Sequence, residues 1–131
     1  MTGIEVSVWA EVHPTESREK VETAVRNVLG DVELMGADRG GLTVLEGRYE
    51  GLESLGHLNG MLRRARIRGA ARALFTRSAE EGVLSFGLNK QAAYAGYISF
   101  YRSGESALGP IQITVKGDVS RAMEYLCGFG P

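Results

Sequence analysis

The sequence predicts an α+β fold in which an antiparallel sheet carries helices packed on one face, in the order β-α-β-β-α(broken)-β-β-β-α. Two observations lead to this prediction: apolar residues alternate with polar ones in several short segments, and they recur at helical spacing in others. A third observation is that no repeat, low-complexity tract or linker divides the 131 residues. We therefore expect residues 1–131 to form a single α+β domain with one core.

The first half of the chain predicts a strand, a helix and a hairpin. Residues 4–12 alternate between apolar and mainly polar side chains, which is the pattern of a half-buried strand. Pro14 ends that strand, and either Thr15 or Ser17 can cap the helix that follows, which ends near Gly30. The segments "DVELMGA" and "LTVLEGRYE" then flank "DRGG", a sequence typical of a hairpin turn.

The second half predicts a broken helix, three strands and a closing helix. A helical stripe of leucines starts near Leu52, and the "IRG" of residues 67–69 bends or interrupts the helix before "AARALFTR" continues it. Residues 84–88, the aromatic-rich "AYAGYISFYR" and "IQITVKG" predict strands. Asp118 can cap the last helix.

Charge is distributed unevenly along the chain, although the net charge is only −1. Residues 1–53 contain eleven acidic residues against five Lys or Arg, whereas residues 54–79 contain six Arg and no acidic residue. The remaining residues 80–131 contain five acids and four bases. The central segment is therefore strongly cationic, and the position of the charge says more about partners than the overall balance does.

The central arginines are candidate phosphate ligands, because a guanidinium group offers a planar fork of donors that suits phosphate and carboxylate. The residues we select on this basis are Arg63, Arg64, Arg66, Arg68 and Arg72. The alternative is that these arginines form an ordinary charged surface. Carboxylates of the first predicted helix would then neutralise them, within the chain or across a dimer: Glu16, Glu19 and Glu22.

A second candidate cluster lies in "NKQAAYAGYISFY". Lys90 and Gln91 precede several tyrosines, and cations interleaved with aromatic rings are typical of proteins that bind single-stranded RNA. The alternatives are that the tyrosines pack within the fold and that the polar residues cap a turn. Trp9, on the polar side of the first strand, is either covered by the chain or buried in a dimer contact.

The sequence contains few residues suited to catalysis or to metal binding. His13, His57 and Cys127 are the only histidines and cysteine, and they are scattered where a zinc site needs about four well-spaced ligands. We therefore expect no enzyme activity, no metal and no cofactor. A single cysteine excludes an intrachain disulfide, and neither a signal peptide nor an apolar span of membrane length is visible, so we expect a cytoplasmic protein without membrane contact.

Three segments together resemble one family: "AEVHPTES", "LNKQAAYAGYISF" and "SALGPIQITV". They look like an archaeal family of small uncharacterised proteins described as predicted RNA-binding or exosome-associated. The resemblance spans nearly the whole chain and implies a fold similar to that of the ribosomal protein that binds five-S rRNA. It also implies a homodimer and a protein partner in an RNA-processing assembly. Members often carry a glutamate or glutamine in the arginine-rich helix, whereas here Ala65 follows Arg64.

These observations favour an RNA-binding protein that contacts phosphates through the central arginine cluster, with Lys90 and Gln91 nearby. The second hypothesis is a protein-interaction module that docks an acidic partner on the same arginines and binds no nucleic acid. A small-molecule enzyme with an arginine-lined phosphate pocket is a weaker third hypothesis, because no general base or nucleophile stands out.

Overall fold

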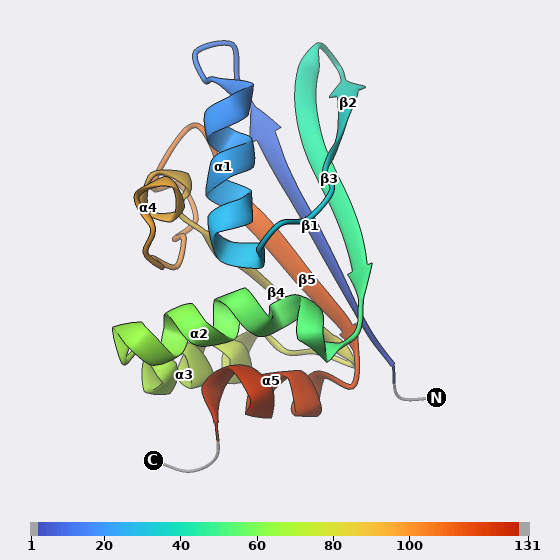
Figure 1. Cartoon of the computed structure of the whole chain (residues 1–131), viewed down its shortest axis with the longest axis vertical. Helices are drawn as coiled ribbons and strands as arrows, with labels where there is room; N and C mark the ends of the chain where they lie inside the picture. Colours follow the sequence, from blue (N-terminus) through green and yellow to red (C-terminus); the bar gives the residue numbers. More distant parts are fainter. Residues whose placement is uncertain (1–2, 129–131) are drawn as a thin grey trace.

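The computed structural model describes residues 3–128, which form a five-stranded antiparallel sheet in the order β2-β3-β1-β5-β4, with the helices on one face (Figure 1). The α+β fold class is confirmed. The strands are β1 (Ile4–Val12), β2 (Met35–Arg39), β3 (Leu42–Glu50), β4 (Val83–Leu88) and β5 (Ile111–Gly117). The helices are α1 (Arg18–Leu29), the 3₁₀ helix η1 (Leu52–Leu55), α2 (Gly56–Ala65), α3 (Arg68–Ser78), α4 (Lys90–Ala95) and α5 (Val119–Cys127).

Strand β1 is the central strand and shows the predicted alternation. It pairs antiparallel with β3 on one side and with β5 on the other. Val6, Val8 and Ala10 are buried on the face that the helices cover, whereas Trp9 points to the opposite face and is 42% exposed. The pleat of a strand thus separates a core face from an open face, as the sequence pattern predicted.

The core lies between the sheet and the helices. Helix α1 lies against β1 in Figure 1, and α2, α3 and α5 gather over the end of the sheet where β1 begins. Phe75 of α3 is fully buried, with its ring centroid 4.7 Å from that of Phe86 on β4. Between residues 3 and 128, no helix has the length and apolar character that crossing a lipid bilayer requires.

The segment "AYAGYISFYR", predicted as a strand, is corrected by the structure. Its first part belongs to helix α4, and Phe100 makes only an isolated bridge with Leu88. The Asn89 side chain accepts a hydrogen bond from the Ala92 N–H and so caps the helix start, and Gly96 ends the helix in the left-handed conformation. These two end signals outweigh the strand preference of the aromatic residues between and after them.

Candidate nucleic-acid interface

The predicted interruption of the central helix occurs at the junction of α2 and α3. Arg66 adopts φ 58° and ψ 37°, a left-handed conformation that non-glycine residues rarely adopt. Its N–H bonds the Arg63 carbonyl at 3.2 Å, and the Ile67 N–H bonds the Leu62 carbonyl at 3.3 Å. These two bonds form a Schellman motif, which closes α2 and lets α3 begin at Arg68.

The junction displays arginine side chains to solvent. Arg63, Arg64 and Arg66 are exposed. Arg63 donates a hydrogen bond of 3.3 Å to the Asn59 side chain, and the Arg64 guanidinium lies alongside Gly60, where an added Cβ would be 3.1 Å from its Nη1 atom. Within residues 3–128, no carboxylate forms an ion pair with any of these three arginines. We call Arg63, Arg64 and Arg66 the arginine junction.

Arg68 and Arg72 have a different environment, at the carboxyl end of α5. Arg72 donates to the Cys127 carbonyl at 3.2 Å and also to the Gly128 carbonyl, so it satisfies two acceptors that the end of the helix leaves open. The Arg68 guanidinium lies against Gly128, with Nη1 2.9 Å from where a Cβ would stand. Both side chains are half-buried, so they do not share the full exposure of the arginine junction.

Carboxylates of the α1 region pair with other basic groups. Glu22 forms ion pairs with Arg18 at 3.0 Å and with Arg26 at 3.5 Å. Glu16 forms an ion pair with Lys90 at 3.0 Å. Among the described residues, neutralisation of the central arginines by these carboxylates within one chain, the alternative considered above, is therefore not observed.

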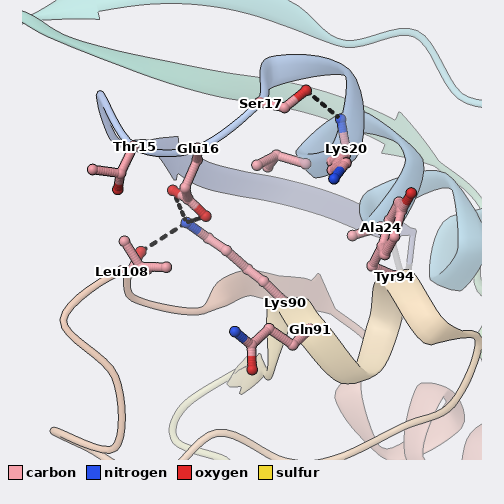
Figure 2. Close-up of a pocket in the computed structure, with 10 residues that line it drawn as sticks. Thr15, Glu16, Ser17, Lys20, Ala24, Lys90, Gln91, Tyr94 and Leu108 are labelled. Atoms are coloured by element: carbon pink, nitrogen blue, oxygen red, sulfur yellow. Dashed lines mark hydrogen bonds and ion pairs between the residues drawn. The ribbon is translucent and has the colours of Figure 1, made fainter.

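Lys90 and Gln91 are neighbours in sequence but occupy opposite environments. Lys90 is 7% exposed, and its ammonium donates to the Glu11 carbonyl at 2.6 Å. It also donates to the Leu108 carbonyl at 2.7 Å and forms the ion pair with Glu16, as Figure 2 shows. These three partners use all three of its N–H groups. Gln91 is exposed and lines a pocket beside this pair. Lys90 therefore holds the fold together and is left out of the proposed interface.

Two observations concern the residues considered above for metal binding and catalysis. No group of three or more His, Cys, Asp or Glu side chains there is arranged to hold a metal ion. Burial raises the pKa of the Cys127 thiol above its ordinary value, although the nearby guanidinium groups of Arg72 and Arg68 oppose that shift. A thiol with a raised pKa is a poor nucleophile at neutral pH.

Comparison with known proteins gives a match to a family described as RNA binding, over residues 5–117. The chain belongs to this RNA-binding family. A "UPF0201 protein" of Thermococcus onnurineus is 37% identical over 123 residues, covering 93% of this chain and 90% of the relative. A protein of the same description from Aeropyrum pernix is 40% identical over 115 residues, covering 86% and 77%. These organisms are archaea, so the archaeal family predicted from the sequence is confirmed.

Solved structures of similar proteins share the fold. The crystal structure of a UPF0201 protein from Methanococcus jannaschii matches with a TM-score of 0.85 and 27% identity, covering 97% of this chain and 95% of that one. Mth689 from Methanothermobacter thermautotrophicus matches with a TM-score of 0.68 and 28% identity, covering 93% and 94%. The whole sheet and its helices are thus a family property rather than a feature of this chain alone.

The left-handed conformation of Arg66 leads to a first prediction. Arg66→Gly should raise the free energy of unfolding by about 1 kcal/mol, because glycine adopts this conformation without the clash of a Cβ atom. Arg64→Gly is the matched control. It removes the same charge two residues earlier inside α2 and should lower the free energy of unfolding by roughly 0.5–1 kcal/mol. Urea titration followed by circular dichroism measures both, and equal losses would contradict the strain at Arg66.

The buried Lys90–Glu16 pair leads to a second prediction. Lys90→Met should lower the free energy of unfolding by about 3–5 kcal/mol, because it leaves a nearly buried carboxylate and two carbonyls without their donor. Lys20→Met, on the exposed side of the same pocket, is the control and should change it by less than about 0.5 kcal/mol. Chemical denaturation measures both values. Similar small effects of the two substitutions would show that the ammonium is not buried as described.

Proposed function

We propose that this protein binds RNA without catalysing a reaction, and that the arginine junction contacts the phosphates. The observation that carries the proposal is the exposure of Arg63, Arg64 and Arg66 on one helix end, with no carboxylate paired to them within residues 3–128. Membership of a family described as RNA binding supports it.

Electrostatics favours an anionic ligand at this place. Arg63 and Arg64 lie in the last turn of α2, where the partial negative charge of the helix end is only about half an elementary charge. Three guanidinium groups exceed that charge several-fold, so the junction repels itself until anions approach. A phosphate backbone supplies those anions, and its condensed counterions are released on binding.

Contacts of this kind recognise the shape and charge of a nucleic acid. Guanidinium–phosphate bonds fix the position and register of the backbone but carry no base information. Arg68, half-buried beside the junction, extends the contact along the start of α3. We therefore expect affinity for structured or single-stranded RNA with little sequence preference from the arginines themselves.

An acidic protein could dock on the same arginines, and this remains the second hypothesis. It predicts no binding to mixed RNA oligonucleotides.

We also propose a homodimer, and a protein partner in an RNA-processing assembly, as the resemblance implied. Trp9 and Met35, which is 77% exposed, lie on the helix-free face of the sheet and offer apolar surface for such contacts. Light scattering in solution decides the oligomeric state, and a monomeric mass would reject the dimer.

The third prediction compares arginines with and without an ion-pair partner. Arg64→Gln/Arg66→Gln should weaken binding to a fluorescently labelled mixed RNA oligonucleotide about tenfold at constant salt, as expected for two exposed charge contacts. Arg18→Gln/Arg39→Gln changes the net charge equally, but those side chains are paired with Glu22 and Glu46. That control should change affinity less than twofold.

Fluorescence anisotropy separates the outcomes of this comparison. Equal weakening of binding by both double variants would mean that RNA affinity depends only on the net charge of the protein. The arginine junction would then not be the site. If the unaltered protein binds no RNA at low salt, the proposed function is rejected and docking of an acidic protein becomes the leading hypothesis.

A further inference from the structure

A pocket of about 350 Å³ lies between the start of α1, helix α4 and the chain before β5. Figure 2 shows its lining, with the Lys90–Glu16 pair on one side and Tyr94 on the other. We propose that this pocket receives one unstacked nucleobase of the bound RNA. This inference rests on the proposed function, because it assigns one base of the bound RNA to a second site apart from the arginine junction.

Tyr94 supplies an aromatic surface at the pocket. Its side chain is 47% exposed, and the Lys20 ammonium lies 5.9 Å from the centre of its ring. Bases stack on such rings regardless of their identity, because every base has a π-face. A lysine beside the ring can also contact the phosphate of the nucleotide whose base is stacked.

Gln91 supplies polar groups on the same side of helix α4. It precedes Tyr94 by three residues, which places the two side chains on one helix face. Gln91 is exposed, and its amide makes no hydrogen bond within the described residues. An amide offers one acceptor and two donors, which matches the edge of an unpaired base.

The floor of the pocket favours an uncharged ring over a phosphate. The Lys90 ammonium already has three partners, and Glu16 accepts hydrogen bonds from Lys90 and from the His13 N–H at 2.9 Å. Both charges are therefore compensated, and neither attracts a further ion. Val21, Ala24 and Leu108 add apolar surface. The volume lies near the lower limit for ligand pockets, which suits a single base.

The pocket and the arginine junction can be used together. In Figure 1, helix α4 and the end of α2 that leads into α3 lie on the same side of the view. Phosphates held by the junction and a base held beside Tyr94 would divide recognition between backbone and base. The pocket would then provide the base preference that the arginines lack.

The fourth prediction uses fluorescein-labelled single-stranded adenosine, uridine and cytidine homopolymers in anisotropy titrations at one salt concentration. Tyr94→Ala should weaken binding about tenfold through loss of one stacked base, and Tyr94→Phe should stay within twofold. Tyr97→Ala is the matched control, because Tyr97 is 58% exposed on the same segment but does not line the pocket. It should stay within twofold. Gln91→Ala should reduce the spread of affinities among the homopolymers.

A second measurement separates failure of the pocket from failure of RNA binding. Nuclear magnetic resonance follows the Gln91 side-chain amide while adenosine or uridine monophosphate is added, and a shift that Tyr94→Ala abolishes supports the pocket. If the homopolymers bind but Tyr94→Ala matches Tyr97→Ala, the base pocket is rejected and the arginine junction stands. If neither homopolymers nor monophosphates bind, both proposals are rejected.

Discussion

The buried contacts of the Lys90 ammonium are the interaction on which the region around α1 and α4 depends. It joins the end of β1, the start of α1 and the chain before β5 through Glu11, Glu16 and Leu108. Because removing one partner from a nearly dehydrated charge costs several kcal/mol, this contact favours the joint packing of the three segments. Lys90 is the first residue of α4, so the same contact helps to hold α4 beside α1, where the two helices line the pocket.

The arginine junction is the opposite case, because no carboxylate within residues 3–128 forms an ion pair with its three guanidinium groups. Two acidic residues near the start of the chain are engaged elsewhere, Glu22 by Arg18 and Arg26 within α1 and Glu16 by Lys90. A net charge of −1 is thus compatible with an uncompensated cationic surface. The buried Lys90 contributes to stability, whereas the proposed binding of RNA would use the exposed arginines of the junction.

Most strands and helices were predicted from the sequence because buried apolar residues recur at the spacing of a strand or a helix, as they do in β1 and β5. It failed at α4, where aromatic composition suggested a strand but the Asn89 cap and Gly96 decided for a helix. The burial of Lys90 could not be predicted, since Glu11 and Glu16 lie 79 and 74 residues away. Neither could the left-handed Arg66, which occupies a position where glycine is usual.

The dependence of RNA affinity on salt tests the central claim most directly. Each phosphate contact on a single strand should contribute a slope of about −0.7 in a plot of log affinity against log salt concentration, so three junction arginines predict roughly −2. Arg64→Gln/Arg66→Gln should make that slope shallower by more than one unit. A slope near zero, or one that the substitutions leave unchanged, would contradict phosphate binding at the junction.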